Sequence, residues 1–210
     1  MLAAVDSPSP SAPRALRLSR PGRRWTRADF ERPTLTVARA LLGPVVCTPS
    51  ERGAFITEVE AYKGPHDLAC HARKGRRTPR VEPLYGAGGT LYVYFVYGMH
   101  WMLNFSSAGR EKPEAVLVRA LCTPTGTRIV GPGRVARHLA LDRRHDGLDA
   151  TRTPELWLED RNLHVPPRLV HRGPRIGIDF AGPYWAARPW RFRVEKPELL
   201  LAAHTARSST

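Results

Sequence analysis

Four strand-length apolar segments, separated by turns rich in glycine and proline, constrain the fold of this 210-residue chain more than any other feature. They cover residues 53–62, 91–97, 101–105 and 115–121. Short segments rich in Val, Ile, Phe and Tyr are typical of β-strands, and the glycine at position 98 indicates a hairpin between the second and third. Helical patterns are few and do not alternate regularly with these strands. The sequence therefore predicts an α+β fold, a single mixed domain with a largely antiparallel sheet.

Further elements are expected around these strands. Thr34 is predicted to cap a helix that ends at Gly43, and a second helix is predicted over residues 134–140. Additional strands are predicted at residues 45–47, 155–159, 175–178 and 190–194. Strict alternation along residues 53–62 would place Glu58 and Glu60 on the same face as Ile56 and Tyr62.

The composition divides the chain into a folded domain with two tails. Residues 1–23 are rich in Ser, Pro, Ala and Arg and predict a disordered basic tail, residues 24–200 form the domain, and residues 201–210 form a C-terminal tail. The first tail lacks the apolar core of a secretory signal, and organelle or nuclear targeting by it stays open. Three cysteines without a CxxC pair favour a reducing compartment, so we expect a cytoplasmic, nucleoid-associated protein.

The charge balance indicates the class of partner. The chain carries 33 Lys and Arg against 19 Asp and Glu, a formal net charge of +14. Such an excess attracts polyanions, which means nucleic acid or an anionic membrane. No apolar run approaches the roughly 18 residues of a membrane-spanning helix, so nucleic acid is the better interpretation and no membrane partner is expected.

Two carboxylates compete for a catalytic role. Glu60 and Glu58 both lie in the middle of the 53–62 strand, and a carboxylate in partly apolar surroundings gains the basicity that a general base needs. The strand pattern alone does not decide between them, and a surface ion pair with an arginine is the plain alternative for either. Cys70 and His71 form a weak zinc candidate, because adjacent ligands without a second pair are unusual in such sites.

Aromatic and polar residues gather on the neighbouring segments. Tyr62, Tyr94, His71 and Asn104 could all be core residues, but their density resembles a pocket in which a flipped nucleobase is stacked and read. Tyr97 stands at the predicted hairpin tip in Tyr97-Gly98-Met99. It is either part of an ordinary packed hairpin or a wedge that replaces an extruded base.

The order of these motifs resembles the alkyladenine (3-methyladenine) DNA glycosylase family over residues 35–194. Residues 56–65 with Asp67 and His71 are similar to the family's catalytic strand and pocket turn. Residues 91–104 are similar to its intercalating hairpin. Residues 131–134, 174–178 and 189–192 match its C-terminal signatures.

The resemblance implies a role for each matching residue. Glu60 would be the general base, and Arg119 with the backbone carbonyl of Ile176 would help to hold the attacking water. The residues that would bind and read the flipped base are Tyr62, His71, Tyr94 and Asn104, the last by excluding normal guanine. Tyr97 would be the wedge, with Met99 beside it.

The resemblance also implies a curved antiparallel sheet and a monomer that works without metal or cofactor. The expected partner is double-stranded DNA containing damaged purines, and the expected reaction is hydrolysis of the N-glycosidic bond without strand cleavage. Two other classes remain as alternatives. A non-catalytic nucleic-acid-binding module would use the tyrosines only for stacking, and a cofactor-free hydrolase would act on a small formyl or acyl substrate.

Overall fold

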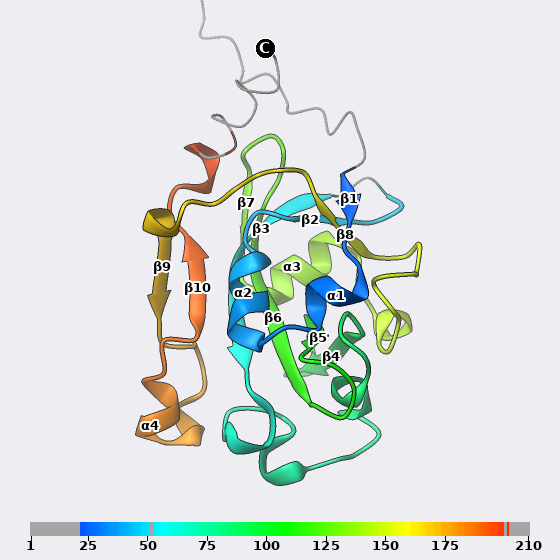
Figure 1. Cartoon of the computed structure of the whole chain (residues 1–210), viewed down its shortest axis with the longest axis vertical. Coiled ribbons are helices and arrows are strands. Elements are labelled where there is room, and N and C mark those ends of the chain that lie inside the picture. The colour runs from blue at the N-terminus through cyan, green and yellow to red at the C-terminus, as the bar shows by residue number, and fades with distance from the viewer. Residues whose placement is uncertain (1–21, 51–52, 200, 202–210) are drawn as a thin grey trace, which may run out of the picture.

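The structure, a computed structural model, describes residues 22–50, 53–199 and 201 (Figure 1). Its strands are β1 (Arg23–Arg24), β2 (Val45–Cys47), β3 (Ala54–Tyr62), β4 (Leu91–Val96), β5 (His100–Ser107), β6 (Glu114–Cys122), β7 (Arg128–Val130), β8 (Trp157–Asp160), β9 (Val170–Gly173) and β10 (Arg191–Val194). Its α-helices are α1 (Arg27–Phe30), α2 (Thr34–Ala40), α3 (Pro132–His138) and α4 (Pro183–Ala186). Short 3-10 helices are η1 (Gly64–His66), η2 (Arg73–Gly75), η3 (Glu82–Tyr85), η4 (Arg143–His145), η5 (Pro167–Leu169) and η6 (Asp179–Ala181).

The strands join in a ten-stranded sheet among these residues, and every pairing is antiparallel. Its main path has the order β1-β8-β2-β3-β6-β5-β4, while β7 pairs with β6 and β10 joins β3 to β9. Figure 1 shows β9 and β10 side by side at one edge, leading down to α4. The predicted α+β fold with a largely antiparallel sheet is confirmed.

Two helices supply the apolar faces that cover the sheet. In α2 and the residue after it, Val37, Ala38 and Leu41 are buried, and in α3 Val135 and Ala136 are buried. Spacings of three and four residues place such side chains on one face of a helix. Both faces join one core cluster with the inner residues of β3, β5 and β6, so the helices fix the strands that carry the site.

A β-bulge in β3 changes which residues share a face. The register against β6 shifts on both sides of Glu58. Ile56 therefore packs in the main core with Val59 and Ala61, whereas Glu60 is on the other face. The prediction that Ile56 shares a face with Glu58 and Glu60 is wrong, because one extra residue reverses the alternation of side chains.

Two local predictions also differ from the structure. Thr34 is the first residue of α2 rather than its cap, and its hydroxyl forms a hydrogen bond of 2.9 Å with the hydroxyl of Ser107. Residues 175–178 form a bend instead of a strand. Their alternating isoleucines resemble a strand, but Arg175 is drawn into a buried ion pair and the backbone turns at Gly177, which has φ +73°.

The predicted tails lie almost entirely outside the described residues, at 1–21 and 202–210. Gly22 and Arg23, which the composition assigned to the first tail, belong to the described fold. The backbone N–H of Gly22 donates to the Glu159 carboxylate at 2.9 Å, and Arg23 begins β1. Within the described ranges, no helix has the length and apolar character needed to cross a bilayer.

A buried ion pair ties three distant segments together below the sheet. The guanidinium of Arg175 donates to both carboxylate oxygens of Asp67 at 2.5 and 2.8 Å, and to the backbone carbonyl of Ala61 at 2.9 Å. Both side chains of the pair are 0% exposed. The backbone N–H groups of Lys63 and Ala69 complete the shell of the Asp67 carboxylate. The pair therefore links the end of β3, the turn after it and the bend before η6.

Replacing Asp67 with Asn should lower the free energy of unfolding by about 3–5 kcal/mol, because it leaves the Arg175 charge buried and unpaired. Chemical denaturation monitored by tryptophan fluorescence measures this change. The matched control is Glu195→Ala, which breaks an exposed pair with Arg193 and should leave stability almost unchanged. Equal losses in the two variants would show that the Asp67 pair does not hold the fold together.

Candidate active site

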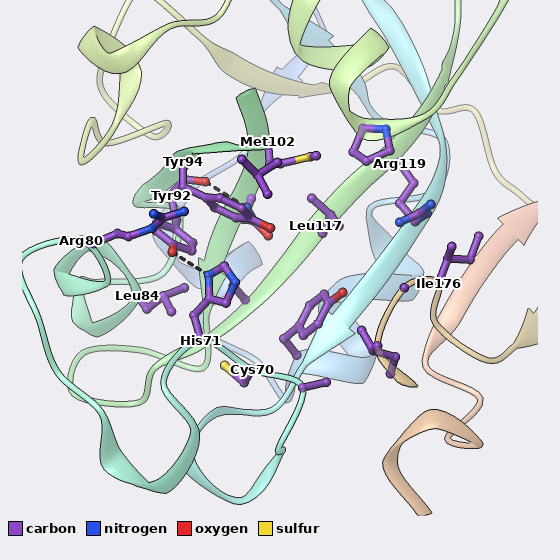
Figure 2. A pocket seen from close by; sticks show the side chains of 18 of the residues that line it. Cys70, His71, Arg80, Leu84, Tyr92, Tyr94, Met102, Leu117, Arg119 and Ile176 are labelled. Atoms are coloured by element: carbon purple, nitrogen blue, oxygen red, sulfur yellow. Dashed lines mark hydrogen bonds between the residues drawn. The ribbon is translucent and has the colours of Figure 1, made fainter. Parts of the chain in front are cut away.

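A pocket of about 330 Å³ opens where β3, β4, β5 and β6 meet the turns that follow η1 and β9. This volume lies within the range of about 300–1,000 Å³ that is usual for small-ligand sites. Figure 2 shows Tyr92 and Tyr94 on one side of the pocket, and Arg119 and Ile176 on the other. The predicted residues Tyr62, His71, Tyr94, Asn104, Arg119 and Ile176 all line it.

Glu60 lies behind the lining residues Tyr62, Arg119 and Ile176, and its exposed fraction is 0%. One carboxylate oxygen accepts the backbone N–H of Ile176 at 2.8 Å, and the other accepts the hydroxyl of Tyr62 at 2.9 Å. The guanidinium of Arg119 approaches the second oxygen at 3.3 Å. The three groups that cover the carboxylate are thus themselves pocket residues.

Burial raises the pKa of Glu60, because a charged carboxylate loses its hydration in the protein interior. The charge of Arg119 opposes this shift most, followed by the N–H of Ile176 and the hydroxyl of Tyr62. The pKa of Tyr62 is also raised, well above its usual value, by burial and by the neighbouring carboxylate of Glu60. The tyrosine therefore stays protonated and donates to Glu60. A carboxylate with a raised pKa inside a pocket is typical of a general base.

Arg119 is shared between two carboxylates. Its guanidinium lies 3.4 Å from Glu58 and 3.3 Å from Glu60, and Glu58 also pairs with Arg191 at 3.1 Å. The Nε of Arg119 is buried and, although it lies 3.4 Å from Glu58, it forms no hydrogen bond with the described residues. The ion pairs with Glu58 and Glu60 hold Arg119 at the pocket. They do not use all the N–H groups of its guanidinium as hydrogen-bond donors.

One wall of the pocket is built from three packed rings. The ring of His71 meets Tyr94 edge-on at 4.7 Å, and Tyr92 lies 4.9 Å from Tyr94. The Nδ1 of His71 shares a hydrogen bond of 2.8 Å with the hydroxyl of Tyr92, drawn as a dashed line in Figure 2. Burial, together with the charges of Arg80, Arg73 and Arg76, lowers the pKa of His71 to about 4. The imidazole is therefore neutral at physiological pH.

Asn104 is 4% exposed on β5, and its amide nitrogen donates to the backbone carbonyl of Tyr92 at 3.0 Å. The sequence left open whether Asn104 was a core residue or part of a base pocket. The structure shows a backbone bond across the β4–β5 pair, and Asn104 also lines the pocket. The bond fixes the orientation of the amide at the pocket floor.

The β4–β5 hairpin carries two exposed apolar side chains at its tip. Tyr97 is 79% exposed and Met99 is 64% exposed. Tyr97 and Gly98 have φ of +54° and +65°, a left-handed backbone that a tyrosine adopts only at some cost. Tyr97 lines the pocket mouth, whereas Met99 lies in a separate groove between the hairpin and α3. The two predicted wedge residues thus point to different sides of the tip.

Several groups at the site were not found from the sequence. Arg80 lines the pocket, donates to the carbonyl of Phe95 at 2.8 Å and lies over the Tyr94 ring at 5.7 Å. Its position inside an arginine-rich loop gives no periodic signal. The ion pair of Asp67 with Arg175 joins residues 108 positions apart, which no local pattern reveals. Cys70 is buried, its thiol donates to the backbone carbonyl of Pro113 at 3.7 Å, and burial raises the pKa of the thiol to about 11.

Comparison with known proteins identifies the family of the chain. The family model described as methylpurine-DNA glycosylase (MPG) matches residues 28–198. A protein of Myxococcus xanthus, named as a candidate 3-methyladenine DNA glycosylase, is 46% identical over 81% of this chain and 90% of its own length. The DNA-3-methyladenine glycosylase of Mus musculus is 36% identical over 79% of this chain and 57% of its own length. The chain therefore belongs to the methylpurine-DNA glycosylase family.

Proposed function

We propose that this protein flips alkylated or deaminated purines out of double-stranded DNA and hydrolyses the N-glycosidic bond with a water activated by Glu60. The observation that carries the proposal is the fully buried carboxylate of Glu60 behind an aromatic pocket, held by Tyr62, Arg119 and Ile176. A module that only binds nucleic acid gains nothing from a buried carboxylate, since its charge would repel the phosphate backbone.

The pocket suits a flat, electron-poor ring. Tyr62 and Tyr94 offer aromatic faces, and the neutral His71 presents its second ring nitrogen without adding a charge. A purine alkylated at ring nitrogen 3 or 7 is cationic, so it stacks well on electron-rich rings and is already a good leaving group. Repulsion by a protonated histidine would weaken this binding, and the lowered pKa of His71 avoids it.

Glu60 would stabilise the oxocarbenium character that develops on the sugar while it accepts a proton from water. Arg119 would help to hold that water, because it lines the pocket and its Nη1 lies 3.3 Å from the Glu60 carboxylate. Asn104 would reject normal guanine, since its fixed amide at the pocket floor clashes with the exocyclic amine. No lysine is among the described residues that line the pocket, so a Schiff base and strand cleavage are not part of the proposal.

Duplex oligonucleotides carrying ethenoadenine, hypoxanthine or 7-methylguanine test the proposal directly. Glu60→Gln should keep DNA binding but reduce base release at least about a hundredfold, because general-base catalysis contributes roughly 10²–10⁴-fold. Glu58→Gln is the matched control, which keeps a hydrogen-bonding group beside Arg119 and should retain most activity. Base release by Glu60→Gln above about a hundredth of the wild-type rate would assign the base elsewhere.

The pH dependence should follow the raised pKa of Glu60. Only the ionised carboxylate accepts a proton, so the rate falls as pH drops through this pKa, which lies above the usual value of about 4.3. Single-turnover release of 7-methylguanine isolates this limb, because that base needs no protonation to leave. Arg119→Met removes the charge that most lowers the pKa, so the limb should move to higher pH. A limb that moves to lower pH, or stays in place, contradicts this assignment.

Tyr97→Ser should slow release from a well-paired lesion far more than from the same lesion in a mismatch. Flipping a paired base costs a few kcal/mol and less when the base is mispaired, and a wedge stabilises the flipped state. The melting temperature should barely change, because Tyr97 is 79% exposed. Equal slowing of both substrates, or unfolding of the variant, would make Tyr97 a packing residue instead.

A further inference from the structure

Large exposed apolar side chains gather on two sides of the pocket mouth. Six of the eight most exposed large hydrophobic residues in the described part of the chain lie in two segments. The β4–β5 hairpin carries Phe95, Tyr97 and Met99, and the segment around η6 and α4 carries Ile176, Phe180 and Tyr184. The hairpin has a proposed role as the wedge, whereas Phe180 and Tyr184 of the second segment have none. A soluble protein seldom exposes such groups without a binding function.

Local geometry explains why Phe180 faces outward. The 3-10 helix η6 has three residues per turn, so Ile178 and Ala181 share a face, and both are buried against Ala69. Phe180 falls off that face and is 67% exposed at the pocket mouth. Gly182, with φ +86°, then turns the chain into α4. The buried side chains of Ile178 and Ala181 therefore hold the segment in place, and the ring of Phe180 is exposed on its surface.

Two arginines accompany these rings. The guanidinium of Arg188 lies 4.0 Å from the centre of the Tyr184 ring, and that of Arg73, on η2, lies 5.8 Å from the centre of the Phe180 ring. Among the described residues neither arginine forms an ion pair. Their charge is therefore free for a phosphate. Aromatic faces beside unpaired arginines are typical of surfaces that hold a single nucleic-acid strand.

We propose that Phe180, Tyr184, Arg73 and Arg188 form a second rim that grips the nucleotides next to the flipped one. A flipped nucleotide remains joined to neighbours on both sides, so its strand must cross the pocket mouth on both rims. The hairpin contacts the strand on one side of the flipped nucleotide, and the second rim contacts it on the other. Phe180 and Tyr184 stack on a base or sugar, and the two arginines contact phosphates. This inference rests on the proposed function, and the chain's net charge of +14 favours DNA over a protein partner.

Single-turnover kinetics with enzyme in excess separate DNA binding from the chemical step of base release. The double variant Phe180→Ser with Tyr184→Ser should raise the half-saturating enzyme concentration by roughly fivefold to a hundredfold, the range of one base–aromatic stack. The limiting rate should fall much less than that. Leu199→Ser is the matched control, an exposed side chain after β10 that is 60% exposed and should change neither quantity. Thermal melting of each variant checks that it is folded.

Salt dependence tests the two arginines. Arg73→Ala and Arg188→Ala should each make the slope of log affinity against log salt for undamaged duplex shallower by about one, because each removes one phosphate contact. Arg168→Ala is the control, since this exposed arginine in η5 belongs neither to the pocket lining nor to the second rim. Its slope should match that of the wild type.

Each outcome decides between the alternatives. Unchanged half-saturation and unchanged slopes would overturn the second rim and indicate a protein partner for this surface. A fall in limiting rate with unchanged half-saturation would also overturn it, because Phe180 would then be only a wall of the base pocket. If the wild type releases no base from any lesion, the proposed function fails, while the salt slopes on undamaged duplex still decide the rim.

Discussion

The buried pair of Arg175 with Asp67 is the interaction on which the site depends. Arg175 reaches the turn after β3 through Asp67, the end of β3 through the Ala61 carbonyl, and the ring of Tyr62 at 4.7 Å. The next residue, Ile176, donates its N–H to Glu60. Because a single guanidinium organises all these segments, the carboxylate, the ring above it and the bend beside it hold one fixed arrangement.

That arrangement has a cost in stability. Glu60 is buried with a raised pKa, so its ionised form is less favourable in the fold than in water. Arg119 offsets part of this cost, yet its pairs with Glu58 and Glu60 are 3.4 and 3.3 Å long, and its Nε lacks a hydrogen bond. In many proteins, replacing a buried ion pair with apolar residues of similar volume leaves stability unchanged or raises it. Charged groups with incomplete hydrogen bonding can persist at a pocket when a bound ligand supplies the missing hydrogen bonds. In the proposed function, the attacking water and the substrate would supply them.

The sequence predicted the long elements well and the geometry between them less well. The segments 53–62, 91–97, 101–105 and 115–121 are strands because apolar, β-branched and aromatic residues leave few other choices. The short strands β1, β7 and β9 have two, three and four residues, and such lengths are too short to reveal the two-residue period of a strand. The bulge at Glu58 was invisible because it depends on the register of β6, a segment far along the chain. For the same reason the hydrogen bond between His71 and Tyr92, and the buried pair of Arg175, could not be read locally.

The strand β4 shows how one uniform pattern can hide two functions. Its apolar residues predict a strand buried on both sides, and its first half fulfils this, since Leu91, Tyr92 and Val93 are at most 2% exposed. The second half leaves the core, so that Tyr94 lines the pocket, and beyond the strand's end Tyr97 reaches solvent in a left-handed backbone. Hydropathy cannot separate the two halves, because aromatic rings suit both a protein core and a stack of bases. Only where the β4–β5 hairpin extends beyond the main core do core-like residues become exposed surface, and this is the surface that the proposed function uses for DNA.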